Sequence, residues 1–255
     1  MSPILLTIQT ASPAGSIALT AGDCLLAEFN LDVRKTPTEW LLQSIEDLLV
    51  KTDVKQTDLD GIAVVHGPGS FTGLRVGLAT AKGLSLATGC PLLGISSLQC
   101  VAMQLPLTGL PVCVMLDARK QEVYTASYRW QGGSPHPISA ETVIGPDQLL
   151  AEISGETLFA GNGAQVYRTL IVRQMGDRAH FTPAFLNLPR AAGAAALAGI
   201  PAARDLGLLG KDERIAVMLA AHAAVAVENA RHYEEREELF LKLRQMQTSR
   251  ERFFA

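Results

Sequence analysis

The sequence lacks the segments that would place it in or across a membrane. None of its 255 residues belong to a run of the roughly 18 uncharged apolar residues that a membrane span requires. The chain starts without a basic region, a hydrophobic stretch and a small-residue cleavage site, so we expect no signal peptide. These absences predict a cytoplasmic protein that does not associate with a membrane.

Paired cysteines and clustered histidines are also missing. The four cysteines have no short paired spacing and lie in apolar surroundings, which favours small core residues in a reducing compartment over ligands or disulfides. Neither His-x-Glu-x-His nor His-Glu-x-x-His occurs, and the histidines are scattered: His66, His136, His180, His222 and His232. The sequence therefore predicts no metal site of its own.

An excess of positive charge is absent as well. The 22 basic and 25 acidic side chains give a net charge of −3, which argues against a protein that holds nucleic acid by its own field. If RNA is involved, we expect another subunit to hold it. No serine lies in a Gly-x-Ser-x-Gly turn, so a nucleophile elbow has no support.

A glycine-rich stretch from Gly67 to Leu84 is the most informative part of the chain. It follows an apolar run, 61–66, that reads as a buried strand, and Ser70 is a suitable N-cap for a helix to about Ala87. Two rows of small residues then recur at a spacing of four: Gly73, Gly77 and Ala81, and Ala79, Gly83 and Ala87.

Each glycine inside a helix costs roughly 1 kcal/mol against alanine, so this helix needs a compensating gain such as the close approach of another backbone. We interpret the helix as a packing surface for a neighbouring protein, and another helix of the same chain is the alternative. A phosphate-binding loop fits less well. Gly73 is followed by Leu74 rather than Lys, and Gly67, Gly69 and Gly73 leave one residue too many for a dinucleotide fingerprint.

The order of the expected elements predicts a mixed α/β fold with two related halves. The first half has strands at 4–9, 16–20, 25–31, 61–66 and 92–95, with helices at 36–51, capped by Thr36, at 71–87 and from Ser97. The second half opens with strands at 112–116 and 122–128, and continues with a helix from Pro146, a strand at 157–160, and helices from Ala164 and at 189–197.

The turn between the strands 112–116 and 122–128 carries Asp117, Arg119, Lys120 and Glu122. These side chains could form an acid/base pair or an anion clamp, or they could be the charged tip of a hairpin. The turn Gly161-Asn162-Gly163 could approach a ligand closely, although a plain turn is the simpler interpretation.

The run from Gly67 to Leu84 closely resembles the signature of the TsaB (YeaZ) family, the bacterial accessory proteins of tRNA threonylcarbamoyladenosine synthesis. The run Asp117-Ala118-Arg119-Lys120-Gln121-Glu122-Val123-Tyr124 is also similar, with Gln121 where the family usually has Gly. With Gly94-Ile95-Ser96-Ser97-Leu98 and Pro189-Arg190-Ala191-Ala192, the resemblance covers roughly residues 3 to 199.

This resemblance implies an actin-like (ASKHA) fold of two ribonuclease-H-like halves: 1–105 with the docking helix, a smaller half at 106–203, and a helical extension at 204–255. It implies a non-catalytic scaffold for the paralogous transferase TsaD, with ATP and metal in that partner and no cofactor of its own. A TsaE-type ATPase would join the complex, tRNA would be reached only through it, and a homodimer would form without the partner.

The resemblance places the partner contact on the glycine-rich helix, where the family forms a helical bundle with TsaD. The implied partner-binding residues are Phe71, Gly73, Leu74, Gly77, Leu78 and Ala81. Charge alone suggests that a nucleotide at a subunit boundary could contact Arg75, Arg119 or Lys120.

Two departures from the family matter for function. The family normally begins Ile-Asp-Thr, but Gln9 follows Ile8 here, which removes the carboxylate that active relatives use around metal and phosphate. The stretch 211–255 has no Gly or Pro, shows three-four spacing of partly apolar residues, and resembles the last helix of a GAF domain leading to a histidine kinase. We expect this segment to project from the domain or to pair with another chain.

Three alternatives to the scaffold stay open at this point. A phosphotransferase of the same fold class would bind ATP by itself, and Gln9 speaks against it. A peptidase, an old association of the wider family, lacks a metal-ligating histidine pair. A two-component signalling adaptor would act through residues 205–255, which no kinase histidine motif follows.

Overall fold

The computed structural model describes residues 2–31, 37–106 and 108–199. The chain divides into two units, Met1–Lys211 and Asp212–Ala255, and everything described below belongs to the first. The predicted cap at Thr36 and the predicted helical extension at 204–255 lie outside the described residues.

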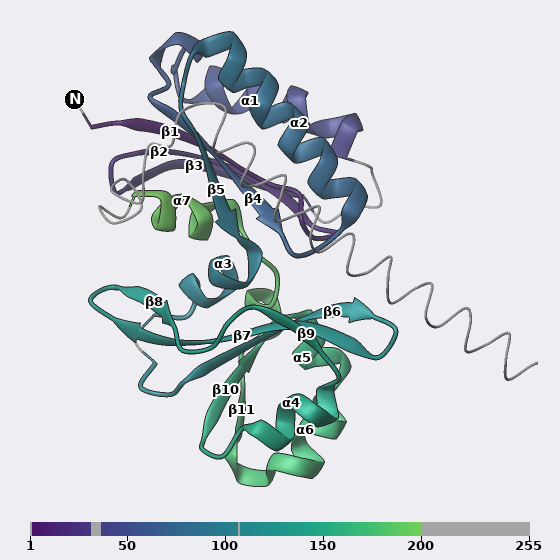
Figure 1. Ribbon diagram of the computed structural model, residues 1–255. Helices are drawn as coiled ribbons and strands as arrows, with labels where there is room; N and C mark the ends of the chain where they lie inside the picture. Colours follow the sequence, from purple (N-terminus) through teal and green to yellow (C-terminus); the bar gives the residue numbers. More distant parts are fainter. Residues whose placement is uncertain (1, 32–36, 107, 200–255) are drawn as a thin grey trace, which may run out of the picture. The chain divides into compact units, whose positions relative to one another are not determined.

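The first half is built on a five-stranded mixed sheet with the strand order β3-β2-β1-β4-β5 (Figure 1). Strands β1, β2 and β3, all three of which the sequence predicted, pair antiparallel in sequence order, and β4 and β5 add in parallel. The strands are β1 (Ile4–Gln9), β2 (Gly15–Ala21), β3 (Cys24–Leu31), β4 (Gly61–Gly67) and β5 (Leu92–Ser96).

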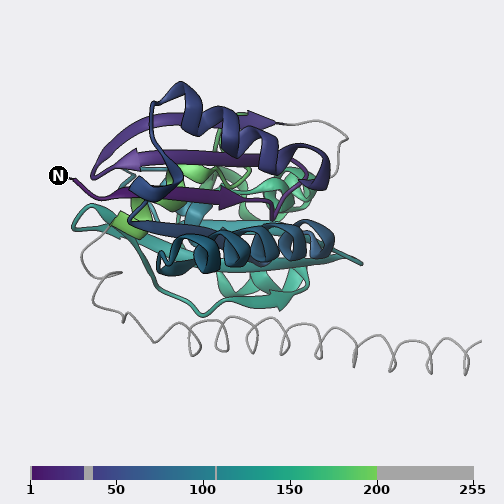
Figure 2. The same ribbon diagram turned by 90° about the horizontal axis from the view of Figure 1, so that it is seen from above.

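Helices cover both faces of this sheet. On the outer face lie α1 (Pro37–Lys51), which packs against β2, and α2 (Phe71–Thr88), which packs against β4; the two helices also touch each other (Figure 2). Ser70 caps α2 as predicted, because its Oγ accepts a hydrogen bond from Gly73 N at 3.3 Å. The opposite face is covered by α3 (Ser97–Met103) and α7 (Ala191–Gly199).

The second half is built on a six-stranded sheet with the order β11-β10-β6-β7-β8, in which β9 also pairs with β7. Its longest pair, β6 with β7, is the predicted antiparallel hairpin. The strands are β6 (Val112–Arg119), β7 (Glu122–Gln131), β8 (Ser134–Pro137), β9 (Thr142–Ile144), β10 (Thr157–Ala160) and β11 (Ala179–Phe181). The sequence predicted a loop where β8 lies and did not predict β9 or β11.

Both sheets repeat one plan. In each sheet the first three strands pair antiparallel in sequence order, and two later strands add in parallel next to the first of them. The resulting orders are β3-β2-β1-β4-β5 and β8-β7-β6-β10-β11, and β9 lies outside this shared plan. The predicted fold class, a mixed α/β fold of two related halves, is confirmed. The predicted domain boundary after residue 105 falls between α3 and β6, and the division at 105 and 203 stays a prediction.

The second sheet is also covered on both faces. Leu98, Val101 and Leu105 from α3 and its end pack with Val112, Val114, Ala126 and Tyr128 on one face. The other face carries Cys113, Met115 and Phe159 beneath the helices α4, α5 and α6. These helices span Pro146–Glu152, Asn162–Val166 and Arg168–Met175.

The chain returns to the first sheet at its described end. After β11, a short 3-10 turn (Ala184–Leu186) packs on the core of the second half through Leu186. The segment 187–190 then leads into α7, whose Ala194, Leu197 and Ala198 are buried with Ala63 and Val65 of the first sheet. Residues 182–190 are therefore a second connection between the halves, and we call them the crossing segment.

Gly73 and Gly77 of α2 do not face a neighbouring protein, as we interpreted them from the sequence, but another part of this chain. A Cβ at Gly73 would lie 2.0 Å from the backbone oxygen of Thr10, and one at Gly77 would lie 2.1 Å from Thr10 Oγ1. Thr10 Oγ1 donates a 2.8 Å hydrogen bond to Gly73 O. The close backbone is thus this chain's own, directly after β1, and the hypothesis that a neighbouring protein fills this row of glycines is wrong.

Two glycine substitutions in α2 should change stability in opposite directions. Gly73→Ala should lower the free energy of unfolding by about 1–3 kcal/mol, because the Thr10 backbone must shift to admit the methyl group. Gly83 is exposed with nothing within 4 Å of an added Cβ, so Gly83→Ala should raise it by about 0.5–1 kcal/mol through helix propensity alone. Urea unfolding measures both, and a gain in stability for Gly73→Ala would contradict this packing.

Candidate functional site

The outward side of α2 carries apolar and small residues that nothing in the described chain covers. Phe71 is 63% exposed and Leu86 is 69% exposed, although both are large apolar side chains. Between them lie the second small row and two cations, all exposed: Arg75, Ala79, Lys82, Gly83 and Ala87. We call this side of the helix the outer α2 face.

An open groove of about 670 Å³ extends this surface toward α1. Leu42, Leu49 and Val50 of α1, Val54 after it, and Leu84 of α2 contribute most of its apolar lining, and Glu46, Asp53 and Lys55 contribute charge. Leu42 is 65% exposed and Val50 is 74% exposed. The outer helix layer therefore offers an apolar surface with a charged border, which is the composition of a protein-binding site.

The six residues predicted to bind a partner do not share one exposed side. Phe71 is exposed and Leu78 is partly buried, so both can be reached from outside. Gly73, Leu74, Gly77 and Ala81 are buried inside the first half and present nothing to a docked protein. The physical reason is that the row of Gly73 and Gly77 faces Thr10, which leaves the row of Ala79 and Gly83 on the solvent side.

The three residues predicted to contact an anion lie on two different elements. Arg75 lies on α2, where its Cζ is 4.5 Å from the centroid of the Phe71 ring in a cation–π contact. Arg119 and Lys120 lie at the tip of the β6–β7 hairpin. A nucleotide contact by these residues stays a prediction.

The β6–β7 tip is a charged hairpin turn with an uncommon backbone. Arg119, Lys120 and Gln121 all have positive φ angles, 63°, 51° and 64°, in the left-handed region that favours glycine. Asp117 Oδ1 accepts a 2.9 Å hydrogen bond from Arg119 N, and Asp117 N donates to Asn162 Oδ1 at 3.2 Å. Of the interpretations left open by the sequence, the geometry supports the hairpin tip.

The Gly161-Asn162-Gly163 turn approaches a backbone rather than presenting an open loop. A Cβ at Gly161 would lie 2.1 Å from Met115 O on β6, and one at Gly163 would lie 2.8 Å from the same atom. Gly161 also has a positive φ of 99°. Both glycines therefore allow the chain to pass close to β6, which agrees with a structural turn.

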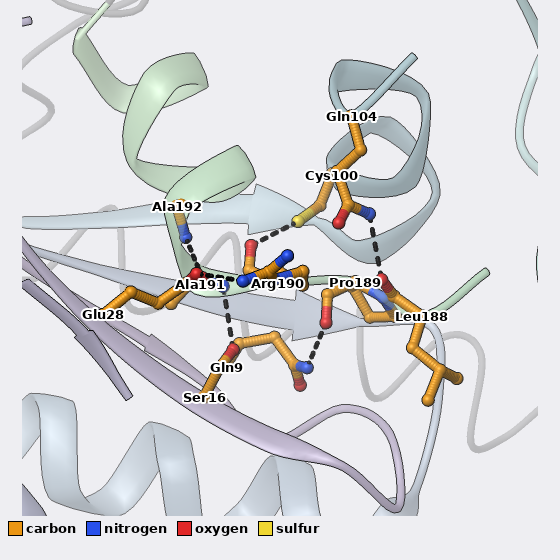
Figure 3. A network of polar contacts seen from close by, with 10 residues as sticks. All are labelled: Gln9, Ser16, Glu28, Cys100, Gln104, Leu188, Pro189, Arg190, Ala191 and Ala192. Carbon is orange, nitrogen blue, oxygen red and sulfur yellow. Dashed lines mark hydrogen bonds and ion pairs between the residues drawn. The ribbon is translucent and has the colours of Figure 1, made fainter. Parts of the chain in front are cut away.

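Gln9 occupies the position where the resemblance implies a carboxylate, and it is completely buried. Its Nε2 lies 2.5 Å from Pro189 O and 3.1 Å from both Ala14 O and Ser12 Oγ, and its Oε1 accepts from Ala11 N at 2.6 Å. The donor and acceptor groups of the amide thus all face groups of this chain, of which Figure 3 shows Pro189 O.

The sequence reading missed the groove residues of α1 and the role of Glu141. Leu42 and Val50 of α1 are apolar but lie outside the side of the helix that is buried. The sequence could have indicated the groove only by this excess of apolar residues over what one buried helix side needs. Glu141 accepts hydrogen bonds from Ser96 Oγ and, at 3.5 Å, from Tyr128 OH, and burial raises the pKa of its carboxyl. Glu141 is a single glutamate in a loop, so nothing in the sequence indicated that it bonds both Ser96 of β5 and Tyr128 of β7.

Burial raises the pKa of two core thiols. The pKa of Cys100 is raised to about 12, although its hydrogen bond to Arg190 O acts in the opposite direction, and that of Cys113 is raised to about 11. Both thiols therefore keep their protons over the physiological range. Cys90, Cys100 and Cys113 are buried as the sequence predicted, but Cys24 is exposed, so the predicted core position is wrong for Cys24, which lies on β3 at the edge of the first sheet.

The described ranges lack both a cluster of metal ligands and a membrane-spanning helix. No three His, Cys, Asp or Glu side chains there are grouped as metal ligands would be. Among the helices of the same ranges, none combines the length and hydropathy of a membrane span.

Comparison with known proteins gives consistent results. A family model described as TsaD, tRNA N6-adenosine threonylcarbamoyltransferase, matches residues 32–223. The tRNA threonylcarbamoyladenosine biosynthesis protein TsaB of Escherichia coli K12 is 34% identical over 172 residues, which cover 65% of this chain and 74% of that protein. TsaB of Bacillus subtilis 168 is 29% identical over 216 residues, which cover 83% and 89%.

Solved structures agree with these relatives. YeaZ from Pseudomonas aeruginosa superposes with a TM-score of 0.69 at 29% identity, over 80% of this chain and 94% of that one. A second structure, described as an uncharacterized protein with similarity to peptidase YeaZ from Pseudomonas aeruginosa, has a TM-score of 0.71 at 29% identity, over 81% and 94%.

Relieving the left-handed backbone at the β6–β7 tip should stabilise the protein. Gln121→Gly should raise the free energy of unfolding by about 0.5–1 kcal/mol, because glycine adopts a φ of 64° without strain. Gln131→Gly, at the last residue of β7, should lower the free energy of unfolding. Glycine there increases the conformational entropy of the unfolded chain and relieves no strain in the folded one. Urea unfolding measures the free energy of unfolding of both variants. Equal changes in the two would argue against a strained backbone at the tip.

The buried thiols should make the protein less stable in alkali. In the unfolded chain a thiol loses its proton near pH 8.5, whereas the folded protein holds it to about pH 11 at Cys113. Between these values the unfolded state binds fewer protons, so stability falls as pH rises, by about 1.4 kcal/mol per pH unit for one thiol.

Cys113→Ala should reduce this slope between pH 9 and 11 even though the variant is less stable throughout. Val114→Ala, an apolar truncation of the neighbouring buried residue, should lower stability and leave the slope unchanged. Guanidinium unfolding at stepped pH measures the slope, and equal slopes in the two variants would contradict the assignment.

Proposed function

Because this chain belongs to the TsaB (YeaZ) family, we propose that it takes part in tRNA threonylcarbamoyladenosine biosynthesis as a non-catalytic scaffold that binds and supports a TsaD-type transferase. Relatives in Escherichia coli and Bacillus subtilis bear the name of that pathway. In this proposal the partner holds ATP and metal, and the complex modifies the adenosine next to the anticodon. A TsaE-type ATPase joins the complex, tRNA is reached only through it, and a homodimer forms when the partner is absent.

The observation that carries the proposal is the outer α2 face together with the groove beside α1. Exposed Phe71, Leu86, Leu42 and Val50 lie on one helix layer, the one formed by α1 and α2. The row of Ala79 and Gly83 between them lets a partner helix approach closely, because it carries no bulky side chain. A helix laid along this row would cover the apolar groove and leave Arg75 and Lys82 at its border.

Gln9 supports the non-catalytic part of the proposal. An uncharged amide whose nitrogen donates to backbone oxygens offers no carboxylate for a cation or for a water near phosphate. We therefore place the catalytic chemistry in the partner.

Binding to a TsaD-type protein should depend on the exposed small row rather than on the buried one. Gly83→Arg fills open space with a bulky cation and should weaken the complex at least about tenfold without loss of stability. The control is Gly155→Arg, the same change at an exposed glycine of the second half with nothing within 4 Å. Co-purification and titration calorimetry with a TsaD-type protein measure the effect.

Equal affinities of wild type, Gly83→Arg and Gly155→Arg would remove the outer α2 face from the interface. Failure of the wild-type chain to bind any TsaD-type protein would remove the scaffold proposal itself. Micromolar ATP binding by the chain alone would instead favour a phosphotransferase.

A further inference from the structure

The crossing segment is held at its first end by one buried amide. Asn187 Oδ1 accepts hydrogen bonds from Gly161 N at 2.7 Å and from Thr182 Oγ1 at 2.7 Å, and its Nδ2 donates to Pro183 O at 3.4 Å. Asn187 is 2% exposed. These bonds fix the start of the segment to the second half, beside β10.

The other end is held by side chains of the first half, shown in Figure 3. Gln9 of β1 donates to Pro189 O at 2.5 Å, and Ser16 Oγ of β2 accepts from Ala191 N at 2.8 Å. Glu28 of β3 forms an ion pair with Arg190 and accepts from Ala192 N at 3.0 Å. Directly after α3, Gln104 Nε2 donates to Leu188 O at 2.9 Å.

Gln9 differs from the other ties because its surroundings demand an N–H donor. The carbonyl oxygens of Pro189 and Ala14 both face its Nε2, and Ser12 Oγ, which donates its own proton to Ala14 O, faces it too. On the other side Ala11 N needs an acceptor, which fixes the orientation of the amide. A carboxylate there would bring its charge against two carbonyl oxygens, and an apolar side chain would remove the hydrogen bond that Gln9 donates to Pro189 O.

We propose that the amide of Gln9, through its hydrogen bond to Pro189 O, keeps residues 188–190 and the start of α7 packed on the first sheet. Released, this segment opens locally while both sheets stay folded. The opening uncovers the contact of α7 with α3, where Gly193 lies against Cys100. The fold thus contains a defined place at which α7 can separate from the rest of the domain.

Cys100 reports such an opening directly. Its thiol is fully buried on α3 and donates a 3.1 Å hydrogen bond to Arg190 O in the crossing segment. Cys113 is equally buried but lies in β6 under the helices of the second half, away from the segment. Local opening therefore exposes Cys100 alone, whereas global unfolding exposes both thiols.

The experiment compares the labelling rates of these two thiols in the full-length chain. All variants carry Cys24→Ser, which removes the exposed thiol, and N-ethylmaleimide labelling is followed by mass spectrometry of the two peptides. Gln9→Glu should raise the ratio of Cys100 to Cys113 labelling at least about tenfold, the factor expected when a buried hydrogen bond is lost. Gln9→Met, neutral and similar in length, should raise it less, because it removes the donor without adding a charge.

Gln43→Glu is the matched control, since this exposed α1 glutamine makes the same chemical change away from the segment. It should leave the ratio at the wild-type value. An unchanged ratio in both Gln9 variants would overturn the proposal. So would a parallel rise at Cys100 and Cys113, because Gln9 would then stabilise the whole fold rather than hold one segment. If Gln9→Glu does not fold, the ratio in Gln9→Met alone decides.

Discussion

The contact between the end of β1 and the start of α2 is the constraint on which the candidate face depends. Thr10 fills the space opposite Gly73 and Gly77, and Ala11 O accepts a 2.7 Å hydrogen bond from Ser70 N just before the helix. This contact leaves no room for a side chain at Gly73 or Gly77. It also sets the rotation of the helix about its axis, and so decides that Ala79 and Gly83 face outward with Phe71 and Leu86.

Two consecutive residues, Gln9 at the end of β1 and Thr10 directly after it, serve the two faces of the first sheet. Successive side chains of a strand point to opposite sides, so Thr10 meets α2 on the outer face while Gln9 meets the crossing segment on the other. The resemblance implies an aspartate at this position. Here the same place in the fold holds an amide that hydrogen-bonds the crossing segment.

Most of the fold could be predicted because its long strands and helices carry their own patterns. The hairpin of β6 and β7 and the first three strands show clear alternation or apolar runs, α1 has a periodic apolar face, and α2 has a cap as well. The missed strands are short: β9 and β11 have three residues each, and β8 contains two prolines. Such segments become strands only because a longer neighbour, β7 or β10, offers a free edge to pair with.

The sequence by itself determined that α2 needs residues without bulk at a spacing of four, and that Gln9 has no charge. Periodicity states which residues share a side of a helix, but it does not state what lies opposite, because that neighbour comes from a distant part of the chain. Only the tertiary structure decided that the row of Gly73 and Gly77 belongs to the core and the row of Ala79 and Gly83 to the surface. It also decided that Gln9 meets Pro189, a contact across 180 residues that no local pattern can encode.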